Sequence, residues 1–243
     1  MVPVFAMLFF SVPVIGLYFS LRCRHFLAAL FLTAVCAVLP ASFAYLLLAL
    51  LLCGPALWQG QLVGSAGAEV YGHAWVQYWV SQQWPSWPLG TALVPAAKDW
   101  PVIDPLPSWI FGLIARQTGQ VLAWNLRVVA GLVVAGLGGV ALARAVGGRE
   151  EIGLVGLGTA PILLGSFTSG LTEDFFFGLL AFAIAASIKG EWRKAGLYLG
   201  ISAFCGLYLT WMGAFCLGAI GLYQIGKKQA IWPILQGGLL AFL

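Results

Sequence analysis

Charged residues are scarce in this 243-residue chain: they make up 8% of it, against 61% hydrophobic residues. A soluble domain carries about 25% charged residues, so the composition excludes that class and indicates an integral membrane protein. The formal net charge of +4 is small and comes from short basic loops. It therefore bears on orientation in the membrane rather than on nucleic-acid binding, which we do not expect.

The apolar runs also lack the alternating segments of about ten residues that build outer-membrane barrels. Helices remain, because every backbone polar group in lipid must be bonded within its own segment. The five cysteines show no metal-type spacing and mostly lie inside apolar runs, which indicates packing or lipid-facing positions. The predicted fold is all-α: a polytopic transmembrane helix bundle with about seven or eight membrane segments.

Apolar runs predict the membrane segments, and basic clusters predict their orientation. The expected segments are a first span over 2–20, a helix kinked at Pro40 over 26–58, an interfacial or half-inserted piece over 108–115, and spans over 121–143, 152–167 and 175–188. Basic residues flank the run 195–225 on both sides, so this run must cross twice, as a hairpin with its turn near 210–213.

We treat residues 1–243 as a single transmembrane domain with one large outer loop over about 59–110. The chain stops within the apolar run 239–243, so we expect it to be the front part of a longer protein. The basic clusters belong in the cytoplasm. The large loop and the acidic turn at Glu173 and Asp174 then share the outer face.

The loop segment from Gly64 to Trp109 is ring-rich, with six of the eleven tryptophans. Its first part predicts a helix over 69–84 with two stripes. The polar stripe holds Glu69, His73, Gln77 and Ser81, and the aromatic stripe holds Tyr71, Trp75, Tyr78 and Trp79. Such a helix suits the membrane interface, with its polar stripe facing water or a cavity. The alternative is a helix that only anchors the loop.

Acidic residues divide between the two sides of the predicted membrane. Those on the outer side are Glu69, Asp99, Asp104, Glu173 and Asp174, whereas Glu150, Glu151 and Glu191 lie among cytoplasmic bases. Acids at a membrane surface, surrounded by tryptophan, are candidates for an active site. The alternative is that water-facing turns simply hold polar residues.

Three pieces of the sequence, taken in order, resemble a known family. They are Glu69-Val-Tyr-Gly-His73-Ala-Trp75, then Trp87-Pro-Leu-Gly90 with Pro95, and then Ala123-Trp-Asn-Leu126 followed by the glycine-rich run 131–148. This order resembles the polytopic membrane glycosyltransferases of the GT-C superfamily, which include protein O-mannosyltransferase-like enzymes and bacterial relatives. The chain departs from the family in having Glu69 where Asp is usual and in an extra first span.

The resemblance implies transfer of a sugar from a polyprenyl-phosphate donor to an acceptor on the outer face of a bacterial inner membrane. It implies that Glu69 deprotonates the acceptor or holds a divalent metal, with Asp174 or Glu173 as partner carboxylate. His73 would orient Glu69 or contact phosphate. Membrane lipids and the lipid-linked sugar donor are the expected partners.

Donor binding needs a cation for the phosphate and flat or polar groups for the sugar. The candidates are Arg116 and Arg127 for the phosphate, and Trp75, Trp79, Asp99 and Asp104 for the sugar, with Trp84, Trp87 and Trp100 as further rings. Snorkelling explains the arginines equally, and an aromatic belt explains the rings.

A non-catalytic membrane protein is the competing prediction. A transporter would show ionisable groups at the membrane midplane and broken helices in matching halves, and the chain has few such charges and no clear internal repeat. A structural subunit would use the glycines of 131–170 for close helix contacts. The glycosyltransferase prediction requires the acids of the loop and of the second outer turn to lie close together.

Overall fold

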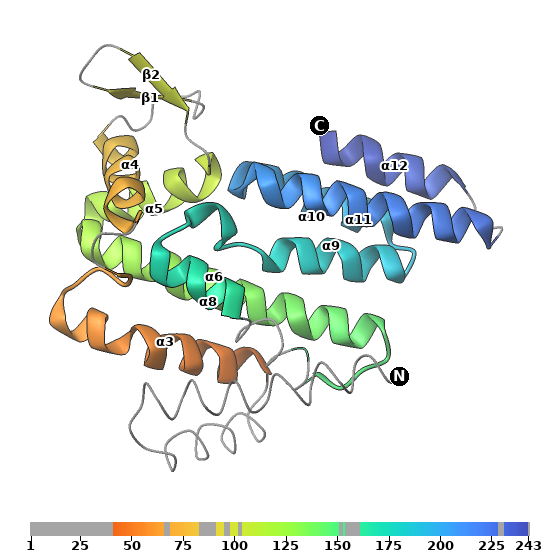
Figure 1. Ribbon diagram of the computed structural model, residues 1–243, viewed down its shortest axis with the longest axis horizontal. Helices are drawn as coiled ribbons and strands as arrows, with labels where there is room; N and C mark the ends of the chain where they lie inside the picture. The colour runs from red at the N-terminus through yellow and green to blue at the C-terminus, as the bar shows by residue number, and fades with distance from the viewer. Residues whose placement is uncertain are drawn as a thin grey trace.

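The computed structural model describes residues 41–65, 69–82, 91–94, 98–101, 104–150, 153, 161–227 and 231–242. This part of the chain is helical apart from loops and one antiparallel pair of short strands, β1 (Thr91–Val94) and β2 (Lys98–Pro101), as Figure 1 shows. The predicted all-α class is therefore confirmed. The predicted first span over 2–20 and the kink at Pro40 lie outside the described residues.

The described part of the chain contains the following helices, in chain order. They are α3 (Ala41–Gln59), α4 (Val70–Gln82), α5 (Pro105–Thr118), α6 (Gln120–Ala145), α8 (Pro161–Ser169), the 3₁₀ turn η1 (Thr172–Asp174), α9 (Gly178–Ile188), α10 (Trp192–Cys205), α11 (Leu207–Gly226) and α12 (Ile231–Phe242). Among the described residues, α6 and α11 are long and apolar enough to cross a membrane. The structure thus supports association with a membrane without establishing the predicted seven or eight segments.

The bundle is organised around α6, which packs against α3, α5 and α9 (Figure 1). On the other side of α9 lies α10, which is covered by α11 and α12. Among the described residues, one apolar core surrounds Trp124 and Phe175 near the start of α6, and another surrounds Trp192 and Leu199 between α10 and its neighbours. The first core supports the segments that carry the outer acids.

Glycines let α6 and α9 approach closely. A Cβ atom on Gly138 would meet the backbone of Gly178, and one on Gly178 would meet the carbonyl oxygen of Val134. Small residues at helix contacts are typical of membrane bundles, where close backbone packing drives association. The glycine-rich run of α6 therefore has a packing role.

Replacing Gly178 with valine should destabilise the bundle by about 1–3 kcal/mol, because the added side chain forces α6 and α9 apart. The measurement is thermal unfolding of the detergent-solubilised protein by circular dichroism. Gly218→Ala is the matched control, since a Cβ atom there meets nothing within 4 Å. Equal unfolding temperatures for the two variants would contradict the packing role.

Helices α10 and α11 form the predicted hairpin, but its turn lies at Gly206. The indole N–H of Trp192, at the start of α10, donates to Oε1 of Gln224 near the end of α11 at 3.0 Å, so the two legs are antiparallel. The prediction of a turn near 210–213 is wrong, because α11 runs unbroken through these residues. Gly206 is required where the turn lies, since a Cβ atom there would meet the carbonyl oxygen of Glu173.

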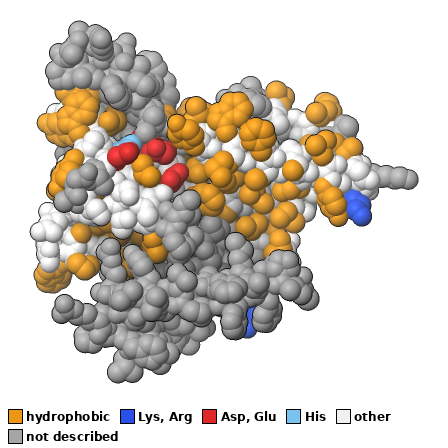
Figure 2. Space-filling model, viewed as in Figure 1, with side chains coloured by type: hydrophobic (Ala, Val, Ile, Leu, Met, Phe, Trp, Pro, Cys, Tyr) orange, Lys and Arg blue, Asp and Glu red, His pale blue; other side chains and the backbone are white. Residues whose placement is uncertain are grey.

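Charges divide between the two ends of the bundle. Arg144, at the end of α6, donates from Nε and one terminal nitrogen to the carboxylate of Glu150 at 2.7 Å, and Lys194 lies 2.8 Å from Glu191. These partners hold the pKa values of Glu150 and Glu191 below their ordinary values. Figure 2 shows the outer acids gathered beside a histidine, with the basic side chains on that face lying apart from them.

Candidate functional site

His73 of α4 is the centre of a group of acidic side chains. Its Nε2 atom lies 3.4 Å from Oε2 of Glu69 and 3.8 Å from Oε2 of Glu173, and its Nδ1 atom lies 2.8 Å from the hydroxyl of Thr172. We call these four residues the histidine–carboxylate cluster. It joins the start of α4 to the turn η1, so the first outer segment and the second acidic turn do lie together.

The cluster is assembled by close backbone contact between two segments far apart in the sequence. The N–H group of Ser65 donates to the carbonyl oxygen of Thr168 at 2.6 Å, just before α4 begins. Gly170 has a positive φ of 78° and lies so close to Val70 that a Cβ atom would meet the backbone of Val70. A glycine is needed at this point both for its conformation and for the space. The contact fixes Glu69 and His73 relative to η1.

Two contacts stabilise the turn η1: a hydrogen bond to Asp174 and the packing of Phe175. Ser166 at the end of α8 donates its hydroxyl hydrogen to Oδ2 of Asp174 at 2.8 Å. Phe175, which follows the turn, is fully buried and packs against Phe167 at a ring distance of 4.7 Å. Asp174 therefore stabilises its own turn, while the neighbouring Glu173 is directed toward His73.

The carboxylates of the cluster differ in their access to solvent. The side chain of Glu69 is 64% exposed, whereas those of Glu173 and His73 are 16% and 12% exposed. The Oε2 atom of Glu173 is buried and has no hydrogen-bond partner among the described residues. A buried carboxylate oxygen without a partner is costly. The Oε2 atom of Glu173 lies 3.8 Å from Nε2 of His73.

The hydrogen bond with Thr172 determines which ring nitrogen of a neutral His73 carries the proton. With Thr172 donating to Nδ1, the proton of a neutral ring sits on Nε2 and points at both carboxylates; with Thr172 accepting, Nδ1 carries the proton and Nε2 is an acceptor. Thr172 is fully buried, so its hydroxyl is held against the ring in either case. The arrangement can pass or share one proton between the imidazole and two carboxylates.

Helix α4 has its polar stripe turned inward. Gln77 and Ser81 are buried, and Tyr71, Trp75 and Tyr78 are exposed. The prediction of a helix over 69–84 is confirmed by α4, but the prediction that its polar stripe faces water or a cavity is wrong for Gln77 and Ser81. The exposed rings of Tyr71, Trp75 and Tyr78 have the placement that an aromatic belt requires, whereas Trp79, stacked on Trp75 at 5.8 Å, is partly buried.

Arg127 and Asp104 form a buried ion pair. The guanidinium of Arg127 donates to Asp104, to the hydroxyl of Ser108 at 3.3 Å and to Oε1 of Gln77 at 3.4 Å, and Ser108 donates to Asp104 at 2.6 Å. All four residues are buried. The structure thus pairs Arg127 with Asp104 between α4, α5 and α6, where both side chains are shielded from solvent.

The other predicted site residues have separate surroundings. Arg116 is exposed on the last turn of α5. Asp99 and Trp100 lie on β2, and their side chains, like all of Trp84 and Trp87, are outside the described part of the structure.

Trp124 and Asn125 belong to the motif Ala123-Trp-Asn-Leu126, and both anchor the loop after α3. The indole of Trp124 donates to the carbonyl oxygen of Val63 at 2.9 Å. The amide of Asn125 accepts from the N–H of Val63 and donates to the carbonyl oxygen of Gln61, both at 2.8 Å. These bonds hold the segment that leads into Ser65, so the motif supports the cluster indirectly.

Sequence reasoning missed Thr172 and the role of Ser166. Thr172 lies in the turn η1 and Ser166 near the end of α8, and their spacing carries no signal that they reach His73 and Asp174. Within the described residues, no three histidine, cysteine or acidic side chains are arranged to hold a metal ion. Comparisons with protein-family models, with curated proteins and with solved structures found no match.

Proposed function

We propose that the protein is a membrane glycosyltransferase that moves a sugar from a polyprenyl-phosphate donor to an acceptor on the outer face. The observation that carries the proposal is His73 lying between Glu69 and Glu173, which come from segments about a hundred residues apart. Reactions of this class need a carboxylate to take a proton from an acceptor hydroxyl. The resemblance of residues 69–75 to GT-C enzymes supplies the reaction class.

The proposed step is a displacement at the anomeric carbon of the sugar. The acceptor oxygen forms the new bond to this carbon, and the bond from the carbon to the phosphate oxygen breaks. Polyprenyl phosphate leaves with the bonding electrons, and the acceptor proton goes to Glu69, whose side chain is open to the outer solvent. His73, held by Thr172, orients Glu69, and Glu173 faces the same ring nitrogen as a second acceptor.

The surroundings of the cluster suit a donor that arrives in the membrane. Trp75 is exposed on α4, where a sugar face or a lipid headgroup can contact it, and its ring stacks on the partly buried Trp79. Arg116 offers an exposed cation on α5. We further propose that the chain forms about seven or eight membrane segments in a bacterial inner membrane, with the cluster on the outer side.

A non-catalytic membrane protein is the second candidate. It is favoured by the fact that both nitrogens of His73 face groups of its own chain. A histidine with partners on both nitrogens can also serve only to hold the start of α4 against the turn η1. In that role, loss of Glu69 should change the stability of the protein and should not change a rate of sugar transfer.

The test is sugar transfer by the full chain in nanodiscs, with synthetic polyprenyl-phosphate mannose, glucose and galactose as donors. Release of polyprenyl phosphate is measured in the presence of a mixed pool of hydroxyl-bearing acceptors, because the donor product reports transfer to any one of them. Glu69→Gln should lower the rate by about 10²-fold, which is typical for loss of a general base. Glu150→Gln, at the opposite end of α6, should leave the rate unchanged.

Two outcomes would contradict the proposal. Unchanged release with Glu69→Gln would remove Glu69 from the mechanism. No release by the unmodified chain from any of the three donors would favour the non-catalytic role.

A further inference from the structure

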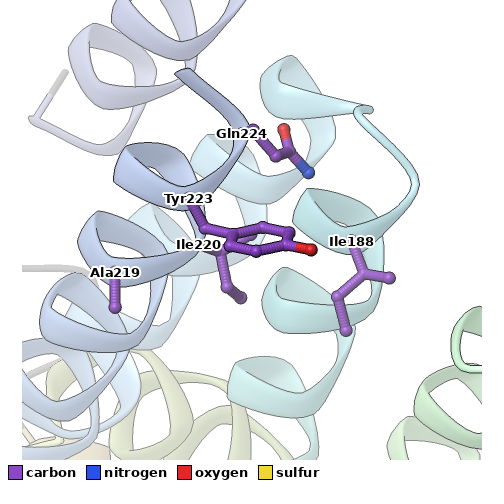
Figure 3. Close-up of a pocket in the computed structure, with 5 residues that line it drawn as sticks. All are labelled: Ile188, Ala219, Ile220, Tyr223 and Gln224. Carbon is purple, nitrogen blue, oxygen red and sulfur yellow. The ribbon is translucent and has the colours of Figure 1, made fainter. Parts of the chain in front are cut away.

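An apolar pocket of about 350 Å³ lies between α9 and α11, at the basic end of the bundle. Figure 3 shows its lining, which is Ile188 on α9 and Ala219, Ile220, Tyr223 and Gln224 on α11. The histidine–carboxylate cluster lies at the other end of these helices. The pocket is therefore separate from the proposed glycosyltransferase site.

One side of the pocket is formed by Gln224, whose amide is hydrogen-bonded within the bundle. The amide nitrogen of Gln224 donates to the carbonyl oxygen of Ser187 at 2.8 Å, and its oxygen accepts from the indole of Trp192 at 3.0 Å. Gln224 thus connects the ends of α9, α10 and α11. With that amide fully engaged, the pocket offers a hydrocarbon surface to an occupant and no unpaired amide atom.

The rim of the pocket is basic. The ammonium group of Lys227 lies 5.6 Å from the ring centre of Tyr223, which lines the pocket, and Lys189 directly follows Ile188 in the sequence. Both lysines are exposed. Lys194 is paired with Glu191 at 2.8 Å, and Lys189 lies near enough to Glu191 to help lower the pKa of that carboxyl. The pocket thus has apolar walls with positive charges at one end.

These features match the chemistry of an anionic lipid. Helix α11 is one of the two candidate membrane spans, and Tyr223 and Lys227 lie at its end, where aromatic rings and lysines meet headgroups. An acyl chain fits the apolar wall, and a phosphate fits the lysines at the rim. Basic pockets between membrane helices on the cytoplasmic side are typical binding sites for anionic headgroups.

We propose that this pocket binds one acyl chain of an anionic phospholipid from the leaflet on the basic side, with the phosphate held by Lys227 and Lys189. The proposal depends on α11 crossing a membrane and is independent of the glycosyltransferase proposal. A neutral lipid with the same acyl chains would gain the apolar contact but not the contact with the lysines.

Native mass spectrometry of the full chain, titrated with phosphatidylglycerol or phosphatidylcholine of identical acyl chains, tests the proposal. Phosphatidylglycerol should be retained about tenfold more strongly. Lys227→Gln should lower its retention about fivefold, which matches the contribution of one basic residue near an anionic surface. Ala219→Trp should remove most of the retention, because the indole fills the pocket.

The matched control is Leu222→Trp, which adds the same ring at an exposed position of α11 that does not line the pocket. Its lipid retention should equal that of the unmodified chain. Equal retention of the two lipids would overturn the proposal, and so would an Ala219→Trp variant that binds phosphatidylglycerol as the Leu222→Trp control does. Circular dichroism confirms that each variant is folded, and Lys227→Gln tests the site without adding bulk.

Discussion

Replacing Asp104 with alanine should destabilise the protein by about 3–5 kcal/mol, the cost of leaving a buried charge without its partner. Arg127 is wholly buried, and Asp104 is the only acid to which its guanidinium is bonded in the described structure. Ser108 and Gln77 also contact Arg127, but neither carries a charge. The measurement is the free energy of unfolding in mixed micelles, followed by circular dichroism.

The matched control removes an exposed carboxylate from another arginine. Glu150→Ala breaks the pair with Arg144, whose side chain is 57% exposed, so water screens both charges and the free energy of unfolding should hardly change. The double variant Asp104→Leu with Arg127→Met removes both charges and should recover much of the lost stability, because well-packed apolar groups can replace a buried pair. Similar losses for Asp104→Ala and Glu150→Ala would contradict the buried pair.

Helix positions were predictable because lipid and interface chemistry leave a strong pattern. The predicted span 121–143 corresponds to α6 (Gln120–Ala145), and the predicted helix over 69–84 corresponds to α4 (Val70–Gln82). The same pattern did not reveal which side of α4 faces inward. In water an aromatic stripe turns into the core, whereas at a membrane interface rings favour the outside and polar groups find partners within.

Pairings between distant segments were not predictable from local pattern. Asp104 and Arg127 are 23 residues apart, and each could be interpreted alone, as an outer-loop acid and as a cation at headgroup depth. Only the packing of α5 on α6 brings them together. Likewise, the turn lies at Gly206 because the backbone of Glu173 approaches closely there. The lengths of the apolar runs do not predict this contact.

The juxtaposition of the two acidic segments, in contrast, followed from topology. Basic clusters assigned the loop before α4 and the turn after α8 to the same side of the membrane, and a shared side is the condition for contact. The structure brings Glu69 and Glu173 to one imidazole nitrogen. Their chemical roles remain the proposal made above, which a comparison of variants can test.

His73→Phe should lower kcat about as much as Glu69→Gln, about 10²-fold, because His73 orients the carboxylate that takes the proton. The double variant should be no slower than either single variant, since residues that act as one unit have non-additive effects. Thr172→Val should also lower kcat, by leaving Nδ1 of His73 without its hydroxyl partner, whereas Thr172→Ser keeps the hydroxyl and should retain activity. The measurement is polyprenyl-phosphate release at varied donor concentration, which separates kcat from KM.

A cluster that served only as a tie would behave differently under the same substitutions. His73→Phe and Thr172→Val would then lower the unfolding temperature, and any loss of turnover would follow the fraction of protein that remains folded. Purely additive losses for His73→Phe and Glu69→Gln would likewise separate the two residues and contradict a shared proton path. The positioning role of His73 therefore depends on a kcat defect in folded protein, on rescue by Thr172→Ser, and on the non-additivity of the pair that lies 3.4 Å apart in the structure.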